Sequence, residues 1–295
     1  MCLYNLLFLI LIVDTSYHSQ RKRRCTDVYP ILGNWNNEVF ETRNCDYHYL
    51  SVDEIRQCLN DRSLFFLGNS IARQFAFEIP RLLQYERSIA SREEEKNMCP
   101  KHFTDTHQTF GCSFYLPNNT NIHVDWFLYH AGRPNTSTIN YSSLQGWDND
   151  ACGNLTSIEC LKLLGLDRAK ESDILLFNMG IADALWEPIG VTAIKEWRQN
   201  NVREFVKNVR SLFNGTVVYM TVSPMNDDRV FSRTIAVNEQ ISDIIRKETN
   251  WLMFDSWATN IDVMKTRFYA DSFHYPGELT KLSWNIILSG LCDYS

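Results

Sequence analysis

Ser70 is the first residue whose type and position could perform chemistry. It follows an apolar run at residues 64–67 and Gly68, and it precedes a segment, 71–83, whose apolar residues recur at helical spacing. A serine at such a strand-to-helix turn would lie beside the first N–H groups of a helix, which favour negative charge such as the oxyanion of acyl transfer. The alternative is that Asn69 or Ser70 only caps the helix.

Asp271 and His274 supply the second half of a catalytic pattern, just before a final apolar-periodic segment at 279–291. An aspartate three residues before a histidine can orient the imidazole from within one loop. The histidine then needs only proximity to Ser70 to act as its general base. Either half alone is more often structural, but together they favour a serine hydrolase or transferase. His130 is a weaker alternative base because no carboxylate lies near it at loop range.

The elements that must position these residues alternate between strands and helices. Beside 64–67, apolar runs predict strands at 122–129, 173–178, 215–222 and 251–255. Helical spacing of apolar residues predicts helices at 158–166, 191–213 and 234–247. The alternation predicts right-handed βαβ units and a three-layer α/β/α fold with a mainly parallel sheet. Ligands bind such a sheet beyond the carboxyl ends of its strands, and the candidate catalytic residues all fall there.

Two blocks of the chain resemble the SGNH (GDSL-type) hydrolases. Gly68-Asn69-Ser70 resembles their first block, which is usually Gly-Asp-Ser, and Asp271-x-x-His274 resembles their last. The resemblance implies a flavodoxin-like, SGNH-type sheet and a Ser-His-Asp site. The sequence departs from the family at Asn69, where an aspartate usually braces the oxyanion loop.

The run at residues 66–74, which ends in Arg73-Gln74, is closer to the PC-esterase branch of that family. This branch includes animal sialate and plant polysaccharide O-acetyl-transfer proteins, and the resemblance covers roughly residues 35–292. It implies an acylated carbohydrate or a glycoprotein glycan as the substrate. Arg73 would touch substrate or fix the oxyanion loop, and a structural salt bridge is the alternative.

The resemblance also implies an oxyanion hole made by the Ser70 N–H, the Gly132 N–H and the side-chain amide of Asn178. Gly132 follows the strand at 122–129, and Asn178 ends the strand at 173–178. The alternatives are an ordinary turn glycine and a local Asx-turn. Asp183 cannot replace Asn178, since an ionised carboxylate does not donate.

Composition bounds the remaining functions. The 295 residues are 44% hydrophobic and carry a net charge of -6, which allows one substantial core and argues against a nucleic-acid partner. We expect no cofactor and no metal. No CxxC pair occurs, and His102 and His107, with Asp105 between them, have a spacing that suits no helical face.

The amino terminus, the cysteines and the sequons together indicate export. Residues 3–13 are apolar but too short to span a bilayer comfortably, so 1–19 is predicted to be a signal peptide, with a signal anchor as the alternative membrane link. Eight cysteines remain after Cys2, which suggests disulfides. Five glycosylation sequons fit a secreted or luminal protein: Asn118, Asn135, Asn140, Asn154 and Asn214.

The predicted organisation is a Cys- and aromatic-rich lead-in at 20–62, followed by an SGNH-like domain at 63–295 with polar insertions at 84–121 and 133–157. The lead-in could also be a disulfide-pinned cap on the edge of the sheet. The predicted function is an esterase or acyltransferase that removes or transfers O-acetyl groups on carbohydrate. The alternative is a secreted glycan-binding protein that keeps the fold but has lost the chemistry. A lipid esterase would want a large apolar lid, which the polar insertions do not resemble.

Overall fold

A six-stranded sheet forms the centre of the computed structural model, which describes residues 23–36, 39–84, 111–115, 122–128, 157–180, 196–224, 228–261 and 277–292. The strands are β5 (Ser63–Gly68), β6 (Gly111–Tyr115), β7 (His123–Leu128), β8 (Ile174–Asn178), β9 (Thr216–Met220) and β10 (Leu252–Phe254). Their order is β10-β9-β8-β5-β7-β6, and only β6, at one edge, pairs antiparallel. The predicted mainly parallel sheet is confirmed.

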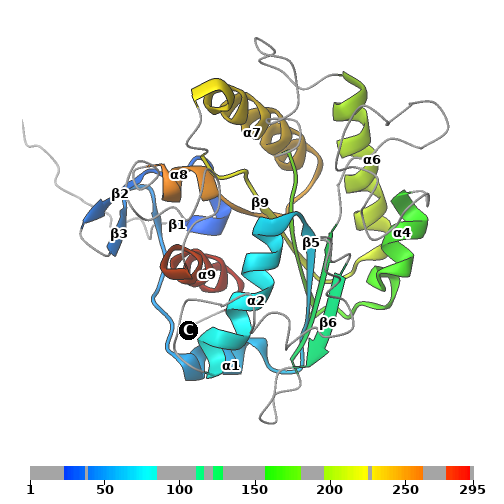
Figure 1. Cartoon of the computed structure of the whole chain (residues 1–295), viewed down its shortest axis with the longest axis horizontal. Coiled ribbons are helices and arrows are strands. Elements are labelled where there is room, and N and C mark those ends of the chain that lie inside the picture. Colours follow the sequence, from blue (N-terminus) through cyan, green and yellow to red (C-terminus); the bar gives the residue numbers. More distant parts are fainter. Residues whose placement is uncertain are drawn as a thin grey trace, which may run out of the picture.

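Helices cover both faces of this sheet (Figure 1). One face carries α1 (Val52–Leu59), α2 (Ser70–Gln84) and α9 (Gly277–Leu291); the other carries α4 (Ser157–Leu163), α6 (Glu196–Leu212) and α7 (Asp228–Glu248). Leu64 and Phe66 of β5 pack into the first layer, whereas Phe65 and Leu67 pack into the second. A strand buried on both faces needs an apolar residue at every position, which explains the continuous run. The three-layer α/β/α prediction is confirmed.

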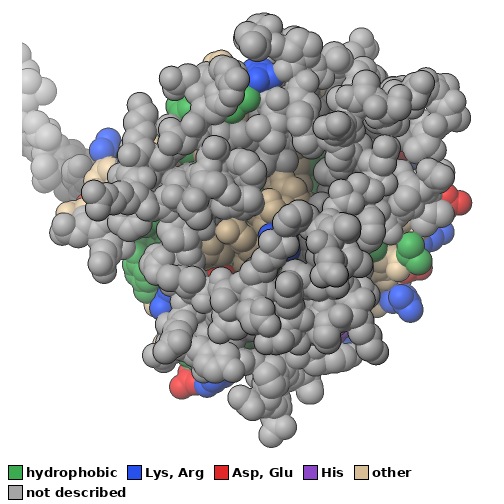
Figure 2. All heavy atoms as spheres, viewed as in Figure 1, with side chains coloured by type: hydrophobic (Ala, Val, Ile, Leu, Met, Phe, Trp, Pro, Cys, Tyr) green, Lys and Arg blue, Asp and Glu red, His purple; other side chains and the backbone are tan. Residues whose placement is uncertain are grey.

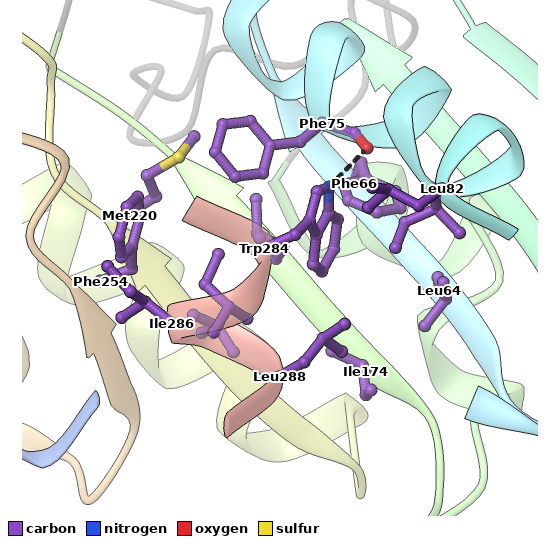
Figure 3. Packing of buried hydrophobic residues seen from close by; sticks show 14 of the residues in the cluster. Leu64, Phe66, Phe75, Leu82, Ile174, Met220, Phe254, Trp284, Ile286 and Leu288 are labelled. Carbon is purple, nitrogen blue, oxygen red and sulfur yellow. Dashed lines mark hydrogen bonds between the residues drawn. The ribbon is translucent and has the colours of Figure 1, made fainter. Parts of the chain in front are cut away.

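Trp284 of α9 joins the last helix to α2 (Figure 3). Its indole is buried, and its Nε1 donates to the carbonyl oxygen of Phe75 at 3.1 Å. The Trp284 ring also packs against Phe66 and Phe75, with centroid distances of 5.8 and 5.6 Å. Contacts of Trp284 in α9 therefore help to fix the position of α2, the helix that begins at Ser70.

The lead-in is fastened to the β10 side of the domain. It contains β1 (Arg23–Arg24), the 3-10 turn η1 (Cys25–Asp27), a hairpin of β2 (Gly33–Asn36) and β3 (Val39–Thr42), and β4 (Cys45–Asp46). Disulfides join Cys25 to Cys45 and Cys58 to Cys292, and η1 packs against α9 and β10. Trp35 Nε1 donates to the carbonyl oxygen of Thr259 at 2.9 Å. These contacts join the lead-in to α9, β10 and Thr259, and the predicted boundary between lead-in and domain stays a prediction.

Helix α1 and strand β6 were not predicted, nor were the short strands of the lead-in. Helix α1 begins with a capping box in which Ser51 and Glu54 bond reciprocally, and this signal is present in the sequence. Strand β6 falls inside the stretch expected to be a polar insertion. Cys160 is also disulfide-bonded, and disulfides are consistent with an extracytoplasmic location. Among the residues with described positions, no helix is both long and apolar enough to cross a bilayer.

Candidate active site

A ligand is expected to bind at the carboxyl ends of β5 and β8. Numbered in chain order, the five parallel strands are arranged 2-1-3-4-5, the flavodoxin-like order, and β5 and β8 are strands 1 and 3. Ligands bind such sheets in the crevice at the carboxyl ends of these two strands, where the order reverses. Leu67 pairs with Phe177, so Gly68 and Asn178 end the two strands at the same level. Ser70 follows two residues after Gly68.

Asn69 is the amino-terminal cap of α2. Its Oδ1 accepts a hydrogen bond from the Ile71 N–H at 2.9 Å, and its carbonyl oxygen accepts from the Arg73 N–H at 3.1 Å. Ser70 is then the first residue inside the helix, where backbone N–H groups lack intrahelical acceptors. Asn and Asp cap helices about equally well, so Asn69 caps α2 as an aspartate at this position would. The predicted capping role is confirmed for Asn69, and it leaves Ser70 at the start of the helix.

Asn178 is buried beside the backbone of Gly68, with 3% of its surface exposed. A Cβ added to Gly68, where φ is +154°, would collide with Asn178 Oδ1. Only glycine fits this contact. Asn178 Oδ1 has no hydrogen-bond partner among the described residues. The sequence pointed to Gly68 only as the residue that ends a strand, and its close contact with Asn178 was missed.

Arg73 lies half-buried in the first turn of α2, where both predicted roles, substrate contact and structural ion pairing, stay predictions. Figure 2, viewed from the same side as Figure 1, shows mainly tan backbone and polar atoms where described residues are visible at the centre of this face. Asn214 is exposed. The other predicted site residues lie outside the described part of the chain: Asp271, His274, Gly132, His130, His102, His107, Asn118, Asn135, Asn140 and Asn154.

A histidine–aspartate pair that the sequence did not single out occurs on β7. His123 Nδ1 lies 3.1 Å from Asp125 Oδ2. His123 pairs in register with Ser63, at the amino end of β5. A strand of this length separates the amino edge from the carboxyl edge by roughly 17 Å. His123 is therefore too far from Ser70 to act as its base.

A groove of about 650 Å³ lies elsewhere, between the lead-in and α7. Tyr29, Trp257 and Asp255 are among the described residues that line it, and Ser70 is not. Burial raises the pKa of Asp255 to about 6, although hydrogen bonds from Ala258 N–H and Ile31 N–H oppose the shift. Burial likewise raises the pKa of Tyr29 to about 12. Asp255 is a structural carboxylate, because it holds the lead-in and the start of α8 (Ser256–Asn260).

No protein-family model matches the chain, and no curated protein matches it. The solved structures that are similar include a GDSL-like lipase from Parabacteroides merdae, with 13% identity over 79% of this chain and 97% of its own, and a TM-score of 0.43. A lipolytic G-D-S-L family member from Veillonella parvula has 13% identity over 77% and 96%, with a TM-score of 0.43. A variant of an acetyl xylan esterase from Geobacillus stearothermophilus has 15% identity over 80% and 98%, with a TM-score of 0.40. At these values the similarities assign neither a family nor an activity to this chain.

Proposed function

We propose that this protein is a serine esterase of the SGNH type with Ser70 as its nucleophile. The observation that carries the proposal is the position of Ser70: it is the first residue of α2, at the switch point between β5 and β8, two residues after the Gly68 that lies against the buried Asn178. A hydroxyl beside helix N–H groups and a side-chain amide donor is the arrangement that acyl transfer requires.

The reaction would proceed in two steps. In the first, His274 takes the proton of the Ser70 hydroxyl while Ser70 Oγ bonds to the ester carbonyl carbon, and Asp271 stabilises the imidazolium. The oxyanion would accept hydrogen bonds from Ser70 N–H, Gly132 N–H and Asn178 Nδ2. Collapse breaks the ester bond, and His274 returns the proton to the leaving alcohol. Water then attacks the acyl-enzyme in an esterase, or a sugar hydroxyl attacks it in an acyltransferase. This second step mirrors the first: His274 takes a proton from the attacking water or sugar hydroxyl, the bond between the acyl carbon and Ser70 Oγ breaks, and His274 returns the proton to Ser70.

Two features of the described residues support this role. Asn69 fixes the first turn of α2 by its cap bond, so the Ser70 N–H is held in place before substrate binds. Gly68 lets Asn178 approach the end of β5. Both features fix the positions of groups at the carboxyl end of β5, where the proposed oxyanion would form.

The proposed substrate is an O-acetyl group on carbohydrate, as the resemblance of residues 66–74 to the PC-esterase branch implies. The proposed setting is the secretory pathway or the extracellular space, which the disulfides Cys25–Cys45 and Cys58–Cys292 support. The net charge of -6 disfavours polyanionic partners.

The test is turnover of p-nitrophenyl acetate by the secreted protein beside Ser70→Ala and His274→Ala. We expect each variant to lose about 10³-fold or more of the activity. Ser211→Ala, which removes an exposed hydroxyl on α6, is the matched control and should keep full activity.

A serine-directed fluorophosphonate probe separates the remaining outcomes. Labelling of wild type but not of Ser70→Ala, without turnover of the small ester, would indicate a transferase that lacks its acceptor. Folded wild type that neither turns over the ester nor takes the label would overturn the proposal and favour the binding protein that keeps the fold.

A further inference from the structure

A tight turn between α6 and β9 presents Asn214 at the amino edge of the sheet. Asn214 is exposed, and Asn214-Gly215-Thr216 is an acceptor sequence for N-linked glycosylation. Thr216 is the first residue of β9, so the turn lies at the end of the sheet opposite to Ser70. Across a strand of this length the two edges are roughly 17 Å apart.

Asp173 holds this turn against the sheet. The Thr216 N–H donates to the carbonyl oxygen of Asp173 at 2.9 Å, and a side chain on Gly215 would collide with that carbonyl. The Asp173 carboxylate is buried and accepts from the N–H groups of Ser63 and Lys170, both at 2.8 Å. The backbone that follows Asn214 therefore has a fixed position, and Asn214 is more exposed than Phe213, Gly215 and Thr216.

A pocket of about 420 Å³ opens next to this turn. Gly215 and Thr216 line it from the turn, and Arg210, Asn250 and Trp251 are among its other walls. Arg210 is steadied by a 2.8 Å hydrogen bond from Nη1 to the carbonyl oxygen of Glu248, and its guanidinium carries five N–H donors. These groups combine a cation, an amide and a hydroxyl with an aromatic ring.

Trp251 gives this pocket a rigid apolar wall. Its half-buried ring packs against Phe177 at a centroid distance of 5.6 Å, nearly edge-on. A fixed aromatic surface surrounded by a few hydrogen-bonding groups suits a sugar, which has apolar C–H faces and hydroxyl groups at its rim.

We infer that Asn214 carries an N-linked glycan and that its first sugars rest in this pocket. The donor would be an oligosaccharide linked to a lipid pyrophosphate. The Asn214 amide nitrogen bonds to the anomeric carbon of the first sugar, the bond from that carbon to the pyrophosphate oxygen breaks, and the amide loses one proton. The glycan then covers the amino edge of the sheet and leaves the carboxyl edge open. This inference does not depend on Ser70 being catalytic.

The attachment is tested by glycopeptide mapping of the full chain secreted from a eukaryotic cell. We expect the peptide that contains Asn214 to carry a glycan in wild type and in Thr216→Ser, which keeps the acceptor sequence. The glycan should be absent from Asn214→Gln and from Thr216→Val, which is close to threonine in shape. An unmodified Asn214 in the secreted wild type would overturn the inference.

The seating is tested by melting temperature, since a glycan held in the pocket must stabilise the fold. Wild type should melt about 2–4 °C above Asn214→Gln, the shift expected for one added contact in a domain of this size. Arg210→Ala and Asn250→Ala should reduce this glycan-dependent difference to less than half, whatever each does to the stability of the unglycosylated form. Equal glycan-dependent differences in all backgrounds would show a glycan that points into solvent, and the seating would be wrong.

Discussion

Buried polar side chains at the carboxyl edge of the sheet differ in their hydrogen bonding between two regions, one beyond β9 and β10 and one beyond β5 and β8. Beyond β9 and β10 the groups satisfy one another. Asn238 of α7 accepts from the Val222 N–H at 2.8 Å and donates to the Val222 carbonyl at 2.7 Å. Asp255 accepts from the Ile31 and Ala258 N–H groups at 3.0 and 3.1 Å. In this region of the edge, both side chains are used to satisfy backbone groups, although both also line the groove between the lead-in and α7.

Beyond β5 and β8, Asn178 is as deeply buried as Asn238, with 3% against 2% of its surface exposed. Its Oδ1, however, has no hydrogen-bond partner among the described residues, and it lies against a glycine. Buried amides are normally paired, because an unpaired one costs free energy of folding. Asn238 therefore contributes to stability. The ligand role of Asn178 stays a proposal, and it rests on the Nδ2 donor, since an amide oxygen only accepts hydrogen bonds.

Asn178→Ala should give the largest effect on catalysis of the variants that compare the two regions of the edge. Loss of one oxyanion donor is expected to lower kcat for p-nitrophenyl acetate by about 100- to 1,000-fold. The stability should change little, because the removed amide has an unpaired oxygen. Asn178→Asp should be at least as inactive, since an ionised carboxylate only accepts hydrogen bonds. Kinetics and urea unfolding of both variants make the measurement, and a variant that unfolds easily yet keeps its kcat would reverse the assignment.

Asn238→Ala should do the opposite. It leaves the N–H and carbonyl of Val222 buried without their partner, which is expected to cost about 2–4 kcal/mol in the free energy of unfolding. The kcat of the folded fraction should stay within about twofold of wild type, since Asn238 is not part of the proposed oxyanion hole. Asn200→Ala is the control because it removes an exposed amide, and it should stay within about 0.5 kcal/mol of wild type. A large loss of kcat in Asn238→Ala would mean that the region beyond β9 and β10 also contributes to catalysis, and the contrast between the two regions would be wrong.

The contact between Gly68 and Asn178 can be isolated by a double-mutant cycle. Gly68→Ala brings a methyl group onto Asn178 Oδ1, so it should lower both stability and kcat. In the background of Asn178→Ala this collision is gone, and the same change should be less damaging by about 1–2 kcal/mol. Unfolding free energies of the four proteins give the coupling. Additive effects would mean that the two residues do not constrain each other.

The sheet could be predicted because its strands are buried on both faces and are therefore continuous apolar runs, as β5 and β8 illustrate. Strand β6 was not predicted, because this short edge strand has no continuous apolar run and lies within a polar stretch. Helix α1 could have been found from Ser51 and Glu54, whose spacing is that of a capping box.

The candidate site likewise has features that a local sequence pattern predicts and features that it does not. The position of Ser70 follows from a local pattern, namely an apolar strand, a glycine and a helix. The contact of Gly68 with Asn178 joins residues 110 positions apart, and the bond from Ile31 N–H to Asp255 spans 224. No local pattern contains such contacts, since they arise only when the strands are side by side. The roles of Asp271, His274 and Gly132 stay predictions.

Asp255, beyond β10, provides the test with the smallest expected effect. Because its pKa is raised from 3.8 to about 6 in the folded state, the folded protein binds a proton more tightly than the unfolded chain does. Stability should therefore rise as the pH falls through the folded-state value. Between about pH 7 and about pH 5, wild type should gain about 1 kcal/mol relative to Asp255→Asn, which has no carboxylate to titrate. Urea unfolding across this pH range makes the comparison, and a difference that stays flat or shrinks toward acid would mean that burial does not dominate at Asp255.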